Sequence, residues 1–159
     1  MIILGIDPGT RTTGYGVVEK KERGILNIAY GEIQVKKGEY LSICLDKIYG
    51  QLSEIIMKYG PDVIVVEDIF YGKNVRSLIK LGQARGVIIL AASHSNTPIY
   101  EYTPLEVKKA VVGYGRAEKT QVQHMVRAIL SLKETPPPDA SDALAIAICH
   151  AHFLKEVSV

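Results

Sequence analysis

Residues 2–19 read IILGIDPGTRTTGYGVVE. The unbroken apolar run Ile2 to Ile6 predicts a strand that is buried on both faces. Gly14 to Glu19 predicts a second strand, and Leu26 to Val35 alternates well enough to predict a third. Because only short connections join these three segments, we expect them to form an antiparallel meander.

The rest of the chain alternates between helical and strand patterns. Apolar residues at helical spacing and helix-ending residues predict helices at 40–59, 74–93, 103–112, 119–132 and 139–155, with strands at 62–67 and 99–102. Strands that are joined by helices should lie parallel to the first strand. The expected fold is α/β, with a mixed five-stranded sheet flanked by helices. Neither a linker nor an internal repeat is evident, so residues 1–159 are expected to form one domain.

Two carboxylates end apolar runs. Asp7 follows the first run, and Glu67 follows Val63 to Val66. An ionised carboxylate beside a buried strand costs several kcal/mol unless it meets a cation or hydrogen-bond donors. If the two strands are parallel neighbours, both side chains emerge at the sheet edge where ligands bind in α/β folds.

Two further carboxylates, Asp139 and Asp142, follow three prolines and precede an alanine-rich helix. Their spacing puts them on one helix face, in the first turn, where the helix dipole favours anions. Four converging carboxylates would make an oxygen-only site suited to Mg²⁺, with Mn²⁺ as a plausible substitute. Such a site could hold two metal ions for in-line displacement at phosphate.

Each carboxylate also has a purely structural interpretation. Asp7 could be a turn residue in Asp-Pro-Gly, and Glu67 could mark a strand end. Asp139 could be a helix cap and Asp142 an acid of the first helical turn. The joint hypothesis is favoured because one sheet edge and one helix could bring all four together.

Basic residues are unevenly distributed along a chain of net charge +2. Residues 71–93 carry no acid and four basic side chains: Lys73, Arg76, Lys80 and Arg85. Residues 105–132 carry five basic side chains against two acids: Lys108, Lys109, Arg116, Lys119 and Arg127. A basic face around an acidic pocket would suit a polyanion, although solvated helix faces would give the same pattern.

Targeting signals and metal-binding cysteines are not evident. No apolar run reaches the roughly 18 residues of a membrane span, and Met1 leads directly into a strand, so we expect a cytoplasmic protein with no membrane partner. Cys44 and Cys149 lack metal-ligand spacing and are expected to be reduced. Gly82 and Gly86 lie four apart in a predicted helix, which indicates close approach of another backbone, within the fold or in a partner subunit.

Several motifs together resemble the RuvC family of bacterial Holliday-junction resolvases. They cover nearly the whole chain in order, and are Ile3 to Val17, Lys80 to Val87, Lys108 to Gly113, Ala117 to Val126 and Asp139 to Ala147. The Gln-Ala-Arg-Gly and Lys-x-Gln-Val-Gln-His-Met segments are the most specific of these.

The resemblance implies an RNase H-like fold and a homodimeric, Mg²⁺-dependent endonuclease of recombination and repair. It implies symmetric nicking of two opposing strands of a four-way DNA junction, leaving 5′-phosphate and 3′-hydroxyl ends, alongside the RuvA–RuvB branch-migration complex. The catalytic, metal-binding acids correspond to Asp7, Glu67, Asp139 and Asp142. Lys108 and Lys119 correspond to basic residues near the cleaved backbone, and Phe70 to an aromatic residue at the junction core.

The remaining assignments keep their alternatives. Phe70 could stack on an unpaired base or pack in the core. Lys73, Arg76 and Lys80 are expected to contact DNA, and the Gly82/Gly86 helix is the expected dimer interface. A nucleotide-binding domain of the actin/Hsp70 type also places Asp-x-Gly-Thr after a first strand, but 159 residues are short for its two lobes. A non-catalytic junction-binding relative is a further possibility, which the intact acidic set disfavours.

Overall fold

The computed structural model describes residues 1–68 and 74–156. Within these residues, five strands form one sheet in the order β3-β2-β1-β4-β5. They are β1 (Ile2–Asp7), β2 (Thr12–Lys20), β3 (Ile25–Gln34), β4 (Val63–Glu67) and β5 (Ile99–Tyr102). β2 pairs antiparallel with β1 and with β3, whereas β4 pairs parallel with β1 and with β5. The predicted mixed sheet is confirmed.

The helices lie close to their predicted positions. They are α1 (Leu41–Tyr59), α2 (Val75–His94), α3 (Pro104–Val112), α4 (Lys119–Ile129) and α5 (Pro138–Glu156). Asn74 caps α2 through the amide of Ser77, and Thr103 forms a capping box with Glu106 at the start of α3. α4 ends three residues earlier than predicted, because Ser131 adopts a left-handed φ of 51° that a helix cannot continue through.

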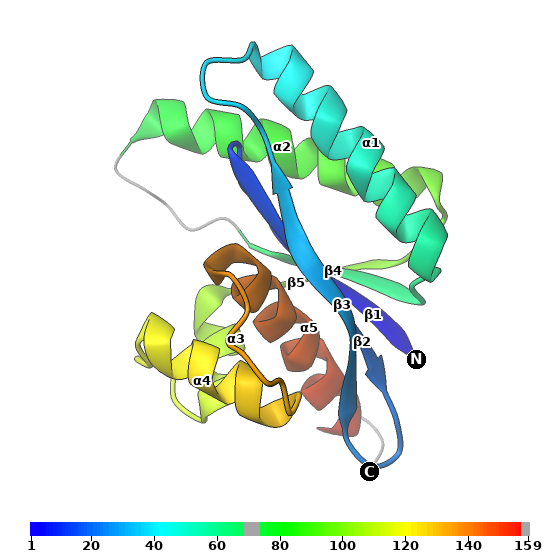
Figure 1. Ribbon diagram of the computed structural model, residues 1–159, viewed down its shortest axis with the longest axis vertical. Coiled ribbons are helices and arrows are strands. Elements are labelled where there is room, and N and C mark those ends of the chain that lie inside the picture. Colours follow the sequence, from blue (N-terminus) through cyan, green and yellow to red (C-terminus); the bar gives the residue numbers. More distant parts are fainter. Residues whose placement is uncertain (69–73, 157–159) are drawn as a thin grey trace.

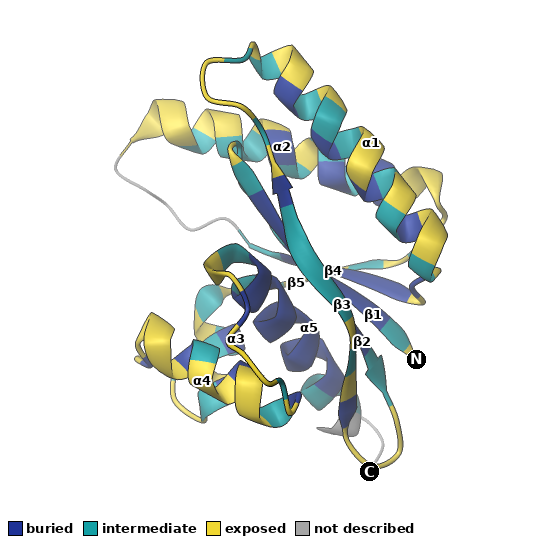
Figure 2. Cartoon of the chain, in the orientation of Figure 1, coloured by how far each residue is buried: buried dark blue, intermediate teal, exposed yellow. Residues whose placement is uncertain are grey.

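The helices cover both faces of the sheet. Figure 1 shows α1 and α2 on one face and α5 on the other, with α3 and α4 packed outside α5. Figure 2 shows that α5 is buried along most of its length, whereas α4 is exposed on its outer side. The all-round apolar sequence of α5 fits this central position between the sheet and two other helices.

Strand alternation divides the core between the two faces. Ile3 and Val65 point toward α5, whereas Leu4 and Val66 point toward α1 and α2. All four side chains are buried, as expected for strands covered on both faces. Along β1 and β4, side chains can therefore reach solvent only where the strands end.

Glycines let α5 lie unusually close to β1 and β2. A Cβ added at Gly14 would overlap the carbonyl oxygen of Asp139, and one at Gly5 would overlap that of Ala143. A Cβ at Gly16 would lie 2.7 Å from the Leu144 side chain and 2.8 Å from its backbone nitrogen. The first two turns of α5 thus rest directly on the strand backbones.

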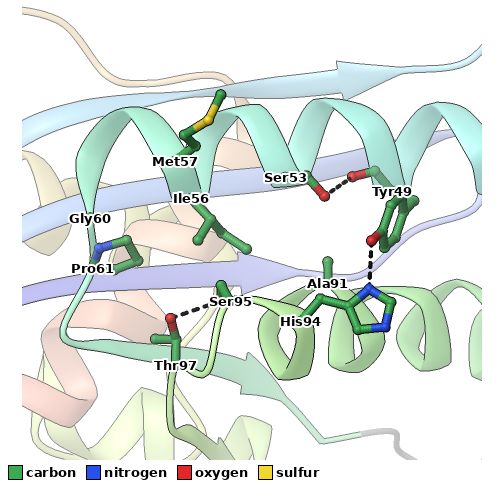
Figure 3. A pocket seen from close by; sticks show the side chains of 10 residues that line it. All are labelled: Tyr49, Ser53, Ile56, Met57, Gly60, Pro61, Ala91, His94, Ser95 and Thr97. Carbon is green, nitrogen blue, oxygen red and sulfur yellow. Dashed lines mark hydrogen bonds between the residues drawn. The ribbon is translucent and has the colours of Figure 1, made fainter.

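Helices α1 and α2 contact each other on the opposite face. Tyr49 Oη and His94 Nδ1 lie 2.7 Å apart, and the two rings meet edge to face. Figure 3 shows these side chains beside a cavity of about 530 Å³ that extends to Gly60 and Pro61, at the start of β4. This cavity is therefore at the opposite end of β4 from Glu67. Among the described residues, no helix is both long and apolar enough to cross a bilayer.

The close approach of α5 gives a first prediction. Gly14→Ala should lower the free energy of unfolding by about 3 kcal/mol or more, because the new methyl group must displace the α5 backbone rather than a flexible side chain. Chemical denaturation measures this change. The matched control is Gly50→Ala in α1, where a Cβ meets nothing within 4 Å and the helix should gain up to about 1 kcal/mol. Equal effects of the two substitutions would contradict this packing.

Candidate active site

Asp7 and Glu67 lie side by side at the C-terminal ends of the parallel strands β1 and β4, in the middle of the sheet. Ile6 pairs with Val66 in the parallel β1–β4 ladder, and each carboxylate is the next residue along its strand. The interpretations of Asp7 as only a turn residue and of Glu67 as only a strand end do not account for this pairing of acids. The predicted convergence of the two strand ends is confirmed.

Helix α5 adds two carboxylates to this edge. Asp139 and Asp142 lie in its first turns, and carboxylate oxygens of Asp7, Asp139 and Asp142 all lie within 4.8 Å of one another. Asp139 is the second residue of the helix rather than its cap, because α5 begins at Pro138. Gly14, beside Asp7 in the β1–β2 ladder, supplies the space for this approach.

The electrostatics of the site are unfavourable without a cation. The pKa of Asp7 is raised to about 8, chiefly by burial and then by the negative charges of Glu67, Asp142 and Asp139, in that order. Burial and the charge of Asp142 also raise the pKa of Glu67. The Glu67 carboxylate is therefore close enough to interact with the cluster, although it is outside the group of mutually close oxygens.

Lys119 partly compensates this negative charge. It is the first residue of α4, and its Nζ lies 2.6 Å from Oδ2 of Asp142. This hydrogen bond raises the pKa of the lysine, so that the ammonium form is favoured. Lys108 on α3 lowers the pKa of Glu67 by its charge. Both lysines line a cavity of about 170 Å³ together with Glu67 and Asp142.

The donor set fits a hard divalent cation. Every candidate ligand is a carboxylate oxygen, and the cluster is half-buried, so a metal ion could enter from solvent. A dication would replace mutual repulsion by attraction and would favour the ionised form of Asp7. The geometry therefore supports a divalent metal site.

Known proteins are similar to this chain in sequence and in fold. Residues 3–150 match the family model described as "Crossover junction endodeoxyribonuclease RuvC". The chain belongs to the RuvC family.

Relatives and solved structures agree with this assignment. The chain is 53% identical over 152 residues to crossover junction endodeoxyribonuclease RuvC of Citrifermentans bemidjiense, covering 96% of this chain and 93% of that protein. A structure of Thermus thermophilus RuvC is 33% identical, with a TM-score of 0.91 and coverage of 99% and 98%. Another structure, of T. thermophilus RuvC in complex with Holliday junction substrate, is 34% identical, with a TM-score of 0.93 and coverage of 99% and 97%. Membership of the RuvC family disfavours the nucleotide-binding alternative.

The residues of 70–80 that were predicted to contact DNA do not line the cavity at the carboxylates or lie outside the described residues. Arg76 and Lys80 are exposed on α2, and each lines a surface hollow there. Phe70 and Lys73 lie outside the described residues, so their expected DNA contacts stay predictions. The structure thus places Lys108 and Lys119, among the predicted basic residues, at the carboxylates.

Gly82 and Gly86 do not mediate close packing among residues 1–68 and 74–156. A Cβ at either position would meet none of these residues within 4 Å. The close approach of a backbone within the fold, one of the two predicted reasons for these glycines, is therefore wrong. In the RuvC-like fold of this chain, Gly5, Gly14 and Gly16 have that role instead.

Two charged residues near the site have contacts that the sequence did not predict. Glu32 on β3 pairs with Gly14, which itself pairs with Asp7, and its charge raises the pKa of Asp139 after the larger effect of burial. A correct prediction of the register of β1, β2 and β3 could have shown that Glu32 lies level with Asp7. Arg85 on α2 contacts Glu101 at 2.6 Å and Asp68 at 3.5 Å, linking α2 to the ends of β5 and β4.

The repulsion among the carboxylates gives a second prediction. Asp7→Asn should stabilise the metal-free protein by on the order of 2 kcal/mol at neutral pH, because the buried carboxyl, with its pKa raised to about 8, must take up a proton on folding and an amide need not. The same change should remove most of the stabilisation that Mg²⁺ gives to the wild type. Thermal unfolding with EDTA and with Mg²⁺ measures both effects. Asp46→Asn, an exposed site on α1, is the control. Unchanged stabilisation by Mg²⁺ in Asp7→Asn would contradict the site.

Proposed function

We propose that this chain resolves four-way DNA junctions by metal-dependent nicking of two opposing strands. The single observation that carries the proposal is the convergence of Asp7, Asp139 and Asp142 beside Glu67 in a member of the RuvC family. A nuclease that works through metal ions uses an anionic metal site next to basic groups, and this end of the sheet offers both. From membership of the RuvC family, we expect the cut strands to carry 5′-phosphate and 3′-hydroxyl ends.

The carboxylates would hold the divalent ions. Asp7, Asp139 and Asp142 would hold the ions together with Glu67, whose charge acts on Asp7. We propose Mg²⁺, two ions per site, with Mn²⁺ as a substitute. Bound ions of this kind lower the pKa of a water nucleophile and stabilise the leaving oxygen.

The two lysines would position the DNA strand. Lys119 holds Asp142 through the 2.6 Å contact and leaves other ammonium hydrogens for a phosphate oxygen. Lys108 lines the same cavity, and its charge lowers the pKa of Glu67. A phosphodiester between them would meet positive charge on its non-bridging oxygens while the carboxylates face the metal ions. Phe70 is proposed to stack at the junction core.

Cleavage of a synthetic junction tests this function. With Mg²⁺ the protein should cut a four-way junction at two symmetric positions and should leave linear duplex of the same sequence uncut. Asp7→Asn should bind the junction about as tightly as the wild type, because the substitution removes a metal ligand and no cation, but should not cut it. Asp46→Asn should cut normally.

Three outcomes of this assay are informative. Binding without any cutting by the folded wild type would indicate a non-catalytic junction-binding relative. Equal loss of binding and cutting in Asp7→Asn would show that Asp7 is structural. Cutting that persists in EDTA would contradict the metal site.

We further propose that the protein is a homodimer, because a junction has two equivalent strands to cut. The exposed face of α2 supports this proposal. Val75, Ile79 and Leu90 are 66%, 58% and 47% exposed, and Gly82 and Gly86 leave open space on the same helix. By its family, the dimer is expected to act with the RuvA–RuvB complex in the cytoplasm.

The proposed dimer interface predicts that one substitution stabilises the monomer and weakens the dimer. Gly86→Ala should raise the stability of the monomer by up to about 1 kcal/mol through helix propensity, but should weaken the dimer because it adds a methyl group to the close interface. Analytical ultracentrifugation measures the association, and thermal unfolding of the dilute protein measures the stability. Gly50→Ala should raise stability and leave the dimer unchanged. If Gly86→Ala left association unchanged, this face of α2 would not be the interface.

A further inference from the structure

A basic pocket lies where three segments meet near the carboxylates. Its volume is about 290 Å³, and we call it the Arg11 pocket after the residue in the β1–β2 connection. Lys36 and Lys37 come from the segment that follows β3, and Lys80 comes from α2. Only Lys80 of these four was predicted to contact DNA, because Arg11, the Lys36–Lys37 pair and Lys80 lie in three segments far apart along the chain.

The charges of this pocket are unbalanced. All four basic side chains are exposed, and the ion pairs among the described residues involve none of them. The acid that lines the pocket is Glu39, whose Oε2 is buried and has no hydrogen-bond partner among the described residues. Four cations thus surround one carboxylate, which leaves a surplus of positive charge in a concave site. Such a site attracts an anion.

The pocket is fixed relative to the carboxylate cluster. Arg11 follows Asp7 by four residues, and the connection between them is closed by a 2.8 Å hydrogen bond from Thr13 Oγ1 to the Gly9 carbonyl. Thr13 is buried, so this contact is shielded from water. The Arg11 carbonyl accepts a 2.9 Å hydrogen bond from the Val35 amide, which places Lys36 beside it. These contacts tie the backbone that carries Arg11 and Lys36 to the connection that follows Asp7.

We propose that the Arg11 pocket binds a backbone phosphate of the DNA that lies close to the scissile phosphate, and so sets where the strand lies over the carboxylates. This inference rests on the proposed function, since it requires DNA at the carboxylate edge. A guanidinium can grip two phosphate oxygens at once, and the three lysines supply charge around it. The contact would position the strand without reading its sequence. The negative charge of Glu39 would repel the phosphate and so weaken its binding to the pocket.

Salt-dependent binding tests the pocket. Arg11→Ala and Lys36→Ala should each weaken binding to a four-way junction by about threefold to tenfold near 0.1 M salt. Each should make the negative slope of log affinity against log salt shallower by about 0.9, the value for one lost phosphate contact. Glu39→Gln should act in the opposite direction and strengthen binding. In cleavage, Arg11→Ala should raise KM more than it lowers kcat.

Control variants separate the pocket from general charge. Arg23→Ala and Lys21→Ala remove the same charges from the exposed β2–β3 hairpin, at the other end of these strands. They should leave the salt slope unchanged. Thermal unfolding of each variant checks that the exposed substitutions leave the fold intact.

The outcomes distinguish this inference from the proposed function. If the wild type cuts junctions but Arg11→Ala and Lys36→Ala keep its affinity and slope, the pocket does not bind phosphate and the function stands. If both pocket and hairpin variants reduce the slope equally, the effect is net charge and the pocket proposal is overturned. If the wild type neither binds nor cuts a junction, the function itself fails.

Discussion

The close packing of α5 on the strand backbones determines the rest of the site. At Gly14 and Gly5 the helix carbonyls occupy the space of a missing side chain, so the axis of α5 cannot move away without opening a void in the core. This contact brings Asp139 and Asp142 to within reach of Asp7. The β1–β4 register brings Glu67 to the same edge. One steric constraint and one hydrogen-bond ladder therefore assemble residues that lie more than a hundred positions apart.

The assembled site is electrostatically costly, and its surroundings show how that cost is limited. The pKa of Asp7 rises to about 8 because the side chain is buried among acids. The Lys119–Asp142 ion pair relieves part of the repulsion. Arg85 ties α2 to the strand ends next to Glu67 through Asp68 and Glu101. The site resembles other functional sites in which the core provides the rigidity that a strained charge distribution requires.

Local patterns predicted the fold and the acids, whereas longer-range geometry was not predictable from them. Apolar periodicity and capping residues placed the strands and helices to within a few residues. Asp7 and Glu67 were recognisable because a carboxylate that ends a buried strand is unusual. Asp139 and Asp142 needed the family resemblance, since a first-turn acid is common in any helix.

The predictions that failed or were incomplete concern contacts between distant segments. Gly82 and Gly86 suggested close backbone approach, but the close contacts are at the glycines of β1 and β2, where sequence spacing gave no helical pattern. Glu32 and the Arg11 pocket depend on strand register and on how loops meet, which no single segment encodes. The expected role of Phe70 lies outside the described residues.

Anomalous scattering from crystals grown with Mn²⁺ tests the central claim most directly. We expect anomalous peaks within coordination distance of Asp7, with Glu67, Asp139 and Asp142 as the other protein ligands. Peaks at other acidic residues, with the Asp7 edge empty at saturating Mn²⁺, would contradict it.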